Sequence, residues 1–466
     1  MGRVEYVMFF RRVAFLGLTL IVALAPLPLG SNRDWSWAPL ASLVGAFVFV
    51  QALSALHPGI KAFQSFRALC VPACLLAMIV GWGLTQAFGW TPVSWENPIR
   101  VASEPSLPVS SYHPVALEGE QVMTGLMRLL TYIGVFVLAA DLTAEPRDAR
   151  RIYGVAVWSA VGYTLYSMFA EVANRMTIAT GISMPTPFAG VFSGPFINRN
   201  NYATYASMAA LAALVLTIGA MRAGASSTWE EERIFDRWPR LLSALSSKGG
   251  LFFVAIAILV TGVLLSGSRG GWVSLAVGLI FAAALLTRNV RRWSVVAATL
   301  LGFIALVFLM PAGSTLLTRG ASLIEHGEEG REYLFSLTTY AISLRPVVGW
   351  GMNSFSSLYS VFQPTALSDT FDKAHNTYLE LAFDFGVPVA AALIVAVMWI
   401  VVRCLRGLSK RRRHRELTGL GVCVAITAGT HALFDFSLQI PGVAVVFAAL
   451  LGAAWAQSWS RRRDVI

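Results

Sequence analysis

Charged residues are scarce in this chain. Asp, Glu, Lys and Arg make up 13% of its 466 residues, whereas hydrophobic residues make up 56% and the mean hydropathy is +0.64. In soluble globular domains about a quarter of all residues are charged, so the composition excludes that class. Apolar runs long enough to cross a bilayer recur instead, and they predict a membrane protein.

Cysteine and paired carboxylates are also scarce. The chain has four cysteines, Cys70, Cys74, Cys404 and Cys423, all in or at the ends of apolar runs. Their spacing suits neither a zinc site nor a disulfide framework. No Asp-x-Asp motif occurs, which leaves Glu118 and Glu120 as the best metal candidates, and we predict no metal site. Basic residues are scattered without interleaved aromatics, so no nucleic-acid partner is predicted.

The apolar runs predict an all-α polytopic membrane protein with twelve spans. They cover residues 13–29, 37–56, 68–87, 121–141, 152–172, 201–221, 250–266, 271–287, 293–311, 385–403, 417–434 and 441–459. The first run is interpreted as a retained span, because later spans support it and no small-residue cleavage site follows it.

Lys and Arg orient these spans. With the N-terminus in the cytoplasm, the predicted cytoplasmic segments hold 26 of the 36 Lys and Arg residues and the opposite side holds nine. Cytoplasmic loops of membrane proteins carry such an excess, so both termini are predicted to be cytoplasmic. The same asymmetry underlies the net charge of +11 and predicts contact with the anionic lipid bilayer.

This topology divides the chain into three parts. Residues 1–311 are predicted to form a membrane domain with spans one to nine, and residues 312–384 a large outer loop with interfacial helices. Residues 385–466 hold spans ten to twelve and a basic cytoplasmic tail. Within the outer loop, "EEGREYLFSLTTYAISL" has the apolar spacing of an amphipathic helix lying at the interface.

Polar residues gather on the predicted outer side. They are Arg199 in "NRNNYATYA", Arg269 in "SGSRGGW", Arg331 in "EEGREYLF", His375 in "AHNTYLELAFDFG" and His431 in "HALFDFSLQIP". Arginine holds phosphate oxygens with two parallel hydrogen bonds and stays charged. Backbone N–H groups of the glycine-rich turn can add donors at a helix start, and a neutral histidine can accept a proton. The set predicts a site for a lipid-anchored phosphate or diphosphate, with a base nearby.

Each stretch also has a structural alternative. The Asn residues of "NRNNY" are good helix caps, and "SGSRGG" can form a tight hairpin whose arginine reaches the headgroups. Arg331 can be a solvated charge beside acidic neighbours. His375 with Asn376 can cap the helix that leads into the next span, and His431 can form a satisfied pair with Asp435.

Five stretches carry a resemblance to a known family: "NRNNYATYASMAA", "SGSRGGW", "RPVVGWGMNSF", "HNTYLELAFDFGVP" and "HALFDFSLQIPGVAVVFAALLG". Over residues 190–460 the chain resembles the O-antigen ligase and polymerase superfamily of bacterial inner-membrane glycosyltransferases. The resemblance implies a multi-span helical fold with a large periplasmic loop, matched by the outer loop. It also implies inverting transfer of a glycan from undecaprenyl diphosphate to an acceptor such as lipid A-core at the periplasmic face, without metal or other cofactor.

The resemblance also implies roles for single residues. Arg269 would hold the donor diphosphate, with Arg199 and Arg331 on looser matches to the other arginine-bearing stretches. His375 would activate the acceptor hydroxyl or stabilise the leaving group. Three further residues are expected to support the site: Asn201, Asn376 and Asp384, the last standing where many members carry Glu.

Several functions remain open at this stage. The leading interpretation is a ligase that moves a preassembled polysaccharide onto lipid A-core or another glycan acceptor. A polymerase that joins repeat units would use the same outer motifs, and a protein-acceptor transferase is a third variant. A transporter of lipid-linked oligosaccharides is disfavoured, because Arg128 and Glu171 are almost the only ionisable residues at depth.

Overall fold

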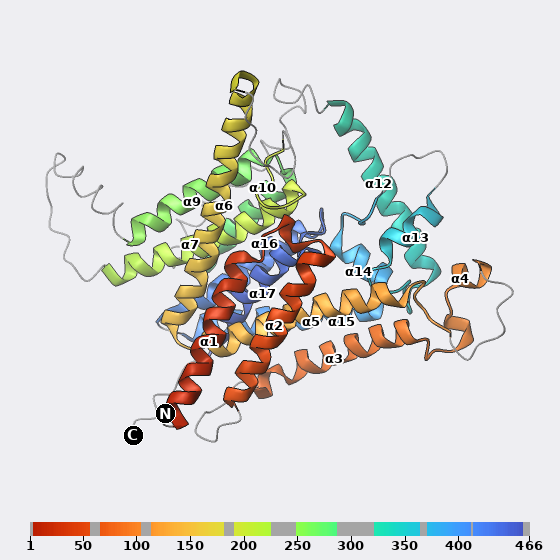
Figure 1. Cartoon of the computed structure of the whole chain (residues 1–466), viewed down its shortest axis with the longest axis horizontal. Helices are drawn as coiled ribbons and strands as arrows, with labels where there is room; N and C mark the ends of the chain where they lie inside the picture. Colours follow the sequence, from red (N-terminus) through yellow and green to blue (C-terminus); the bar gives the residue numbers. More distant parts are fainter. Residues whose placement is uncertain are drawn as a thin grey trace.

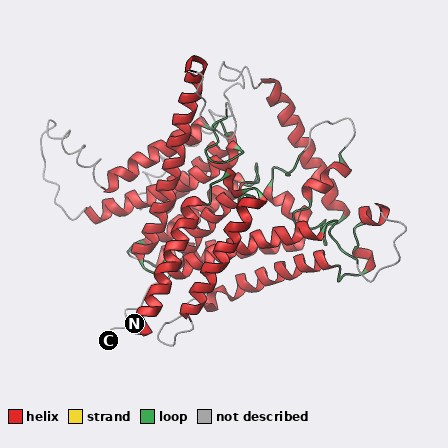
Figure 2. Cartoon of the chain, in the orientation of Figure 1, coloured by secondary structure: helices red, strands yellow, loops and turns green. Residues whose placement is uncertain are grey.

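The protein is a bundle of α-helices. A computed structural model describes residues 3–55, 66–103, 113–180, 191–224, 248–286, 321–363, 371–411 and 413–459. Across these ranges the regular elements are α-helices and short 3-10 helices, and no strand occurs (Figure 2). The predicted all-α class is confirmed.

Long helices occupy the predicted spans. They are α1 (Arg3–Leu24), α2 (Asp34–Ala55), α3 (Phe66–Phe88), α5 (Gly119–Leu142), α6 (Pro146–Thr180), α7 (Arg199–Gly224), α9 (Lys248–Leu265), α10 (Arg269–Leu286), α15 (Val387–Lys410), α16 (Arg415–His431) and α17 (Pro441–Ala456). The predicted span 293–311 lies outside the described residues. Of the described helices, six are long and apolar enough to cross a membrane by length and composition: α2, α3, α5, α7, α10 and α15. The total of twelve spans therefore stays a prediction.

The outer loop contributes helices of its own. α12 (Ala321–Leu344), α13 (Phe355–Phe362) and α14 (Thr377–Phe385) lie together on one side of the bundle (Figure 1). On α12 the buried residues Leu334, Thr338 and Ala341 recur every three to four positions and form one face. A helix over "EEGREYLFSLTTYAISL" is thus confirmed.

The α7 helix lies at the centre of the core. It packs against α6, α9, α10 and α16, and its alanines Ala206, Ala209 and Ala213 are fully buried. Small side chains let helix backbones approach closely in membrane proteins. The same principle applies at Gly278 of α10, where an added Cβ atom would collide with Thr427 of α16.

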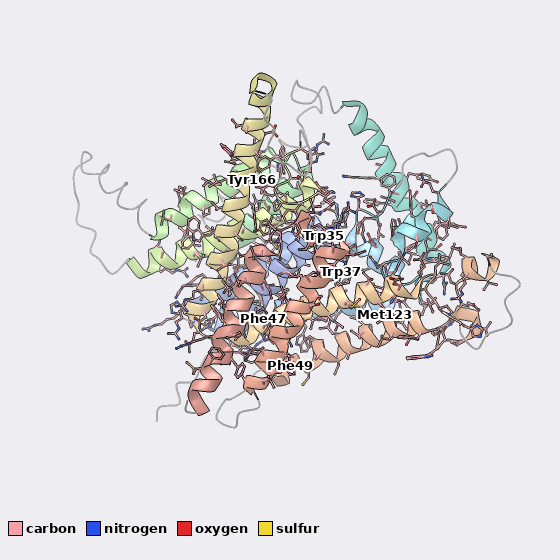
Figure 3. The ribbon with its side chains drawn as sticks, in the orientation of Figure 1. Trp35, Trp37, Phe47, Phe49, Met123 and Tyr166 are labelled. Atoms are coloured by element: carbon pink, nitrogen blue, oxygen red, sulfur yellow. The ribbon has the colours of Figure 1, made fainter. Side chains whose placement is uncertain are left out.

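Large apolar side chains cover the outside of the bundle. Trp35 and Phe49 of α2 are both 65% exposed, and Figure 3 labels them along this helix. Exposed apolar surface on this scale marks a membrane or a partner surface, and these helices are apolar enough to lie in lipid.

The connecting segments sort into two ends of the bundle. At the outer end, Gln86 Nε2 donates to the carbonyl oxygen of Val348 over 2.9 Å. At the inner end, Gln457 Nε2 donates to the carbonyl oxygen of Thr143 over 2.7 Å. Segments predicted to share a side of the membrane therefore meet one another, whereas the identity of each side still rests on the charge asymmetry.

The structure differs from the sequence prediction where the outer loop joins α15. The structural alternative for His375 was a cap on one helix that runs on into the span 385–403. Instead α14 ends at Phe385, Gly386 adopts φ +80°, and α15 begins at Val387. Glycine tolerates this left-handed conformation, so the break divides the segment into two helices.

Candidate functional site

Two of the predicted motifs lie at neighbouring helix starts. Arg199 is the first residue of α7 and Arg269 the first of α10. Gly267 forms the turn before α10 with φ +63°. Ser268 Oγ accepts a hydrogen bond from Gly271 N over 3.1 Å, which caps this helix, and donates to Asn200 Oδ1 over 2.7 Å. The tight turn predicted as a structural alternative exists, and it also joins the two motifs.

Three arginines come together at these helix starts. Arg199, Arg269 and Arg331 are all exposed, and Arg331 and Arg269 lie close enough to Arg199 for their charges to act on it. They belong to three helices, α7, α10 and α12. The N-terminal end of a helix carries a partial positive charge, so two helix starts and three guanidinium groups together favour a bound anion.

His375 has an unusual backbone conformation. Its φ of +49° lies in the left-handed region, which non-glycine residues rarely adopt and which often marks functional sites. Asn376, not His375, caps α14: its side chain accepts hydrogen bonds from Tyr378 N over 3.0 Å and Leu379 N over 3.1 Å. The capping alternative therefore accounts for Asn376 and leaves the histidine ring available for chemistry.

A buried carboxylate lies beside His375. Asp435 Oδ1 is 3.6 Å from His375 Nδ1 and accepts a hydrogen bond from Asn200 Nδ2 over 3.2 Å. Asp435 Oδ2 accepts a hydrogen bond from Ser437 Oγ over 2.5 Å. Burial alone raises the pKa of this carboxyl group, but His375, His431 and Ser437 outweigh it, and the pKa lies below its ordinary value. Asp435 is thus held as a carboxylate.

These contacts link the glycine-rich turn to the histidine. The link runs from Ser268 through Asn200 to Asp435, and from there to His375. Thr377 ties α14 to the same place, because its hydroxyl donates to the carbonyl oxygen of Asp435 over 2.9 Å. His375 is therefore linked to the turn that carries Arg269 and to the start of α7, where Arg199 lies.

The comparison with known families adds a decisive observation. Residues 254–394 match the family model described as O-antigen ligase. This segment, under a third of the 466-residue chain, is therefore similar to the O-antigen ligase family. The match confirms the resemblance to that superfamily, whose members are membrane glycosyltransferase-like ligases. No curated protein shows a significant match to the chain.

The matched segment contains only part of the site. Arg269, Arg331 and His375 lie within residues 254–394, which match the O-antigen ligase model. Arg199 and Asp435 lie outside this segment, and the fold brings them to it. The family match and the six long apolar helices together indicate a membrane protein.

His431 lies beside the candidate site and packs inside the bundle. Its side chain is buried, and Nδ1 is hydrogen-bonded to the hydroxyl of Thr204. The ring lies against the glycine-rich turn, where a Cβ added to Gly270 would be 3.0 Å from it. The carboxylate expected to pair with His431 lies closer to the other histidine, and this pairing of Asp435 with His375 was missed in the sequence.

The supporting residues predicted from the sequence lie in different places. Asn201 is buried, and its Oδ1 has no hydrogen-bond partner in the described part of the chain, whereas its neighbour Asn200 makes the linking contacts. Asp384 Oδ2 accepts a hydrogen bond from Asn353 N over 2.9 Å. Burial and nearby Glu380 raise the pKa of Asp384 well above its ordinary value.

No metal cluster is found near these groups. Within the described ranges, no three or more His, Cys, Asp or Glu side chains are grouped so that they could hold a metal ion. Glu118 accepts a hydrogen bond from Gln121 Nε2 over 2.8 Å. Of the four cysteines, Cys70 and Cys74 are exposed, and Cys404 and Cys423 are buried.

Proposed function

We propose that the chain is a membrane glycosyltransferase that moves a glycan from undecaprenyl diphosphate to a hydroxyl-bearing acceptor such as lipid A-core at the periplasmic face. The observation that supports this most is that three neighbouring arginines lie on the same side of the protein as the His375–Asp435 pair. It combines an anion site with a proton acceptor, which are the two devices that metal-free glycosyl transfer from a diphosphate needs.

The arginines would act on the leaving group. As the bond between the sugar C1 and the diphosphate oxygen breaks, the electron pair and the negative charge move onto the diphosphate. Donors placed in advance where charge develops lower the barrier of such a step. Arg269 and Arg199 at the helix starts, with Arg331 from α12, would bind the phosphate oxygens as forked donors.

His375 would act on the acceptor. Its Nδ1 faces Asp435, so with the proton on Nδ1 the other ring nitrogen, Nε2, is an acceptor. The acceptor hydroxyl forms a new bond to C1 while its proton moves to Nε2. Asp435 stays ionised, holds the ring in this tautomer and stabilises the imidazolium that forms.

The acceptor separates two versions of this function. A ligase would use lipid A-core or another finished glycan, whereas a polymerase would use a second glycan on undecaprenyl diphosphate. The O-antigen ligase domain supports the shared chemistry. The ligase is the proposal that we carry forward.

A defined assay tests the proposal. Purified full-length protein in liposomes, given an undecaprenyl-diphosphate-linked glycan and a lipid A-core acceptor, should form a covalent product detectable by mass spectrometry. His375→Ala should form little or none. Movement of the donor across the bilayer without a product would show a transporter and refute the proposal. Surface glycans of a deletion strain then separate the two versions: unligated full-length chains indicate a ligase, and single repeat units indicate a polymerase.

A further inference from the structure

A long apolar groove lies next to the proposed catalytic histidine. Its cavity has a volume of about 940 Å³ and lies among α5, α14, α15, α16 and α17, with the inner end of α10 below. These helices pack side by side in the bundle (Figure 1). On α15 the lining residues Leu393, Val397, Val401 and Leu405 form one stripe, about 18 Å long at ~1.5 Å per residue.

Polar groups close one end of this groove. Arg128, Asn353, Lys373, Thr377 and Asp384 lie at its outer end, and the other lining residues are almost entirely apolar. A long apolar channel with a polar end has the pattern of a lipid: hydrocarbon chains along the stripe and a headgroup at the outer end.

Two buried atoms at the polar end have no hydrogen-bond partner in the described part of the chain. They are Asp384 Oδ1 and Arg128 Nε. The Asp384 residue is only 7% exposed. Buried polar atoms are nearly always hydrogen-bonded in native proteins, so these two point to a ligand with hydroxyl or anionic groups.

The charges at the polar end suit such a headgroup. Lys373 Nζ pairs with Glu380 Oε1 over 3.0 Å, and Arg128 lies 3.9 Å from the exposed Asp34 carboxylate. Asp384, whose raised pKa favours its protonated form, adds a hydrogen-bond donor. Since both cations already have a carboxylate nearby, the polar end suits a sugar headgroup rich in hydroxyl groups, which can both donate and accept hydrogen bonds.

The end of α16 separates this groove from the three arginines. Gly429, Thr430 and Leu433 line the groove. His431, between them in sequence, contacts Thr204 and the glycine-rich turn on the opposite side. None of the three site arginines lines the groove. The two compartments are therefore neighbours with a common boundary.

His375 lies at that boundary. The next residues connect to the end of α16: Asn376 Nδ2 donates to Leu433 O over 3.2 Å, and Thr377 N donates to Ala432 O over 2.9 Å. Thr377 itself lines the groove. A hydroxyl on a headgroup at the polar end would be next to the histidine, with the diphosphate on the other side.

We infer that this groove binds the acceptor: a lipid-anchored glycan whose hydrocarbon chains fill the apolar stripe and whose polar headgroup meets Arg128, Lys373 and Asp384. This inference rests on the proposed function, because the arginine compartment is assigned to the donor. It gives the two substrates separate compartments that meet at one histidine.

A kinetic experiment tests this assignment. Ala425 of α16 lines the groove and is partly exposed, so Ala425→Trp should occupy the space of a lipid chain. We expect the KM for a lipid A-core acceptor to rise about tenfold or more, with the KM for the donor unchanged. The matched control is Ala391→Trp, which adds the same side chain at an exposed position of α15 that does not line the groove. An unchanged acceptor KM, or a raised donor KM, in folded Ala425→Trp overturns the assignment.

A crosslinking experiment reports on the occupant without requiring transfer. Met398 lines the groove and its neighbour Trp399 does not, although both are about half exposed. Benzoylphenylalanine replaces each residue in full-length protein in cells, and mass spectrometry identifies the captured lipid. Acylated glycolipid enriched at residue 398 over residue 399 supports the assignment. A prenyl lipid, or bilayer phospholipid captured equally at both positions, overturns it. Glycolipid captured at residue 398, combined with no glycan transfer by the wild-type protein, would contradict the proposed function instead.

Discussion

Each end of the bundle has basic side chains near a buried carboxylate, but the two ends differ in how these charges are paired. At the inner end, Glu416 accepts a hydrogen bond from Arg222 over 2.7 Å and lies 3.8 Å from both Arg150 and His414. At the outer end, Asp435 contacts His375, Asn200 and Ser437, whereas the arginines neighbour one another. The inner cations are paired with a carboxylate, and the proposed function assigns the outer arginines to an anionic substrate.

This difference shows how the same residue types serve structure or chemistry. The inner cluster joins α6, α7 and α16 through one carboxylate, so its loss should affect folding. In the outer cluster, the charges of Arg331 and Arg269 act on Arg199, and like charges repel one another at short range. Substitutions that separate stability from turnover therefore test the comparison directly.

The largest expected effect is on transfer in His375→Ala. Removing a general base commonly lowers a rate by about 100- to 10,000-fold, whereas binding of the donor should persist because the arginines hold the diphosphate. Initial rates and donor binding by the purified variant provide the measurement. His375→Asn serves as the control for backbone conformation, since Asn tolerates the left-handed region. Full activity of a folded Asn variant would remove His375 from the mechanism.

Arg269→Lys should have the next largest effect. A lysine keeps the charge but cannot make the forked contact to phosphate oxygens, and loss of a charge-assisted hydrogen bond predicts a fall of about 10- to 100-fold in kcat/KM. Transfer assays with varied donor provide the measurement. Arg406→Lys, at an exposed inner-end position, is the matched control and should leave turnover unchanged. Near-normal transfer by Arg269→Lys would assign only a general electrostatic role to this side chain.

At the inner end, Glu416→Gln should lower the stability of the protein and leave the rate of glycan transfer unchanged. The Glu416 side chain is 3% exposed, and removing one partner of a buried ion pair costs about 3 kcal/mol or more. Thermal unfolding in detergent should show a lower midpoint, while folded protein at low temperature keeps its turnover per molecule. Glu332→Gln, an exposed position on α12, controls for loss of charge. A stable Glu416→Gln variant with impaired transfer would reverse the roles of the two ends.

The smallest expected effect is on stability at acidic pH. Because the folded-state pKa of Asp435 lies below its ordinary value, its ionised form contributes stability that is present above the unfolded-state pKa. That contribution is lost as the pH falls through the folded-state pKa. The stability gap between wild type and Asp435→Asn should therefore be full at neutral pH and close below pH ~3.9. Unfolding midpoints across this range measure it, and a gap that widens in acid would contradict the sign.

Much of the fold could be predicted from the sequence, because long apolar runs and capped helix starts are local signals. The helix predicted over residues 328–344 followed from apolar spacing in the same way, and it forms most of α12. The break at Gly386 was missed, since a glycine in an apolar run indicates a helix end only when its neighbours are known.

The candidate site was predictable only in part. Arg269 and His375 stand in motifs that are visible along the chain, and the arginines' common location followed from the topology. Asp435 was not assigned to His375, because 60 residues separate them in the chain and the nearer His431 was the obvious partner. The groove was also missed, since its lining residues look like any apolar helix face until five helices are placed together.

The joint between the outer loop and α15 has a consequence for protein engineering. Val387 N donates to Pro346 O over 2.7 Å, and Trp350 N donates to Phe383 O over 2.8 Å. A Cβ on Gly386 would collide with the carbonyl of Val347. Loop and helix therefore form one interlocked unit, and a chimera that exchanges the outer loop for that of a relative has its natural junction after Val387, within α15, rather than at the end of the loop.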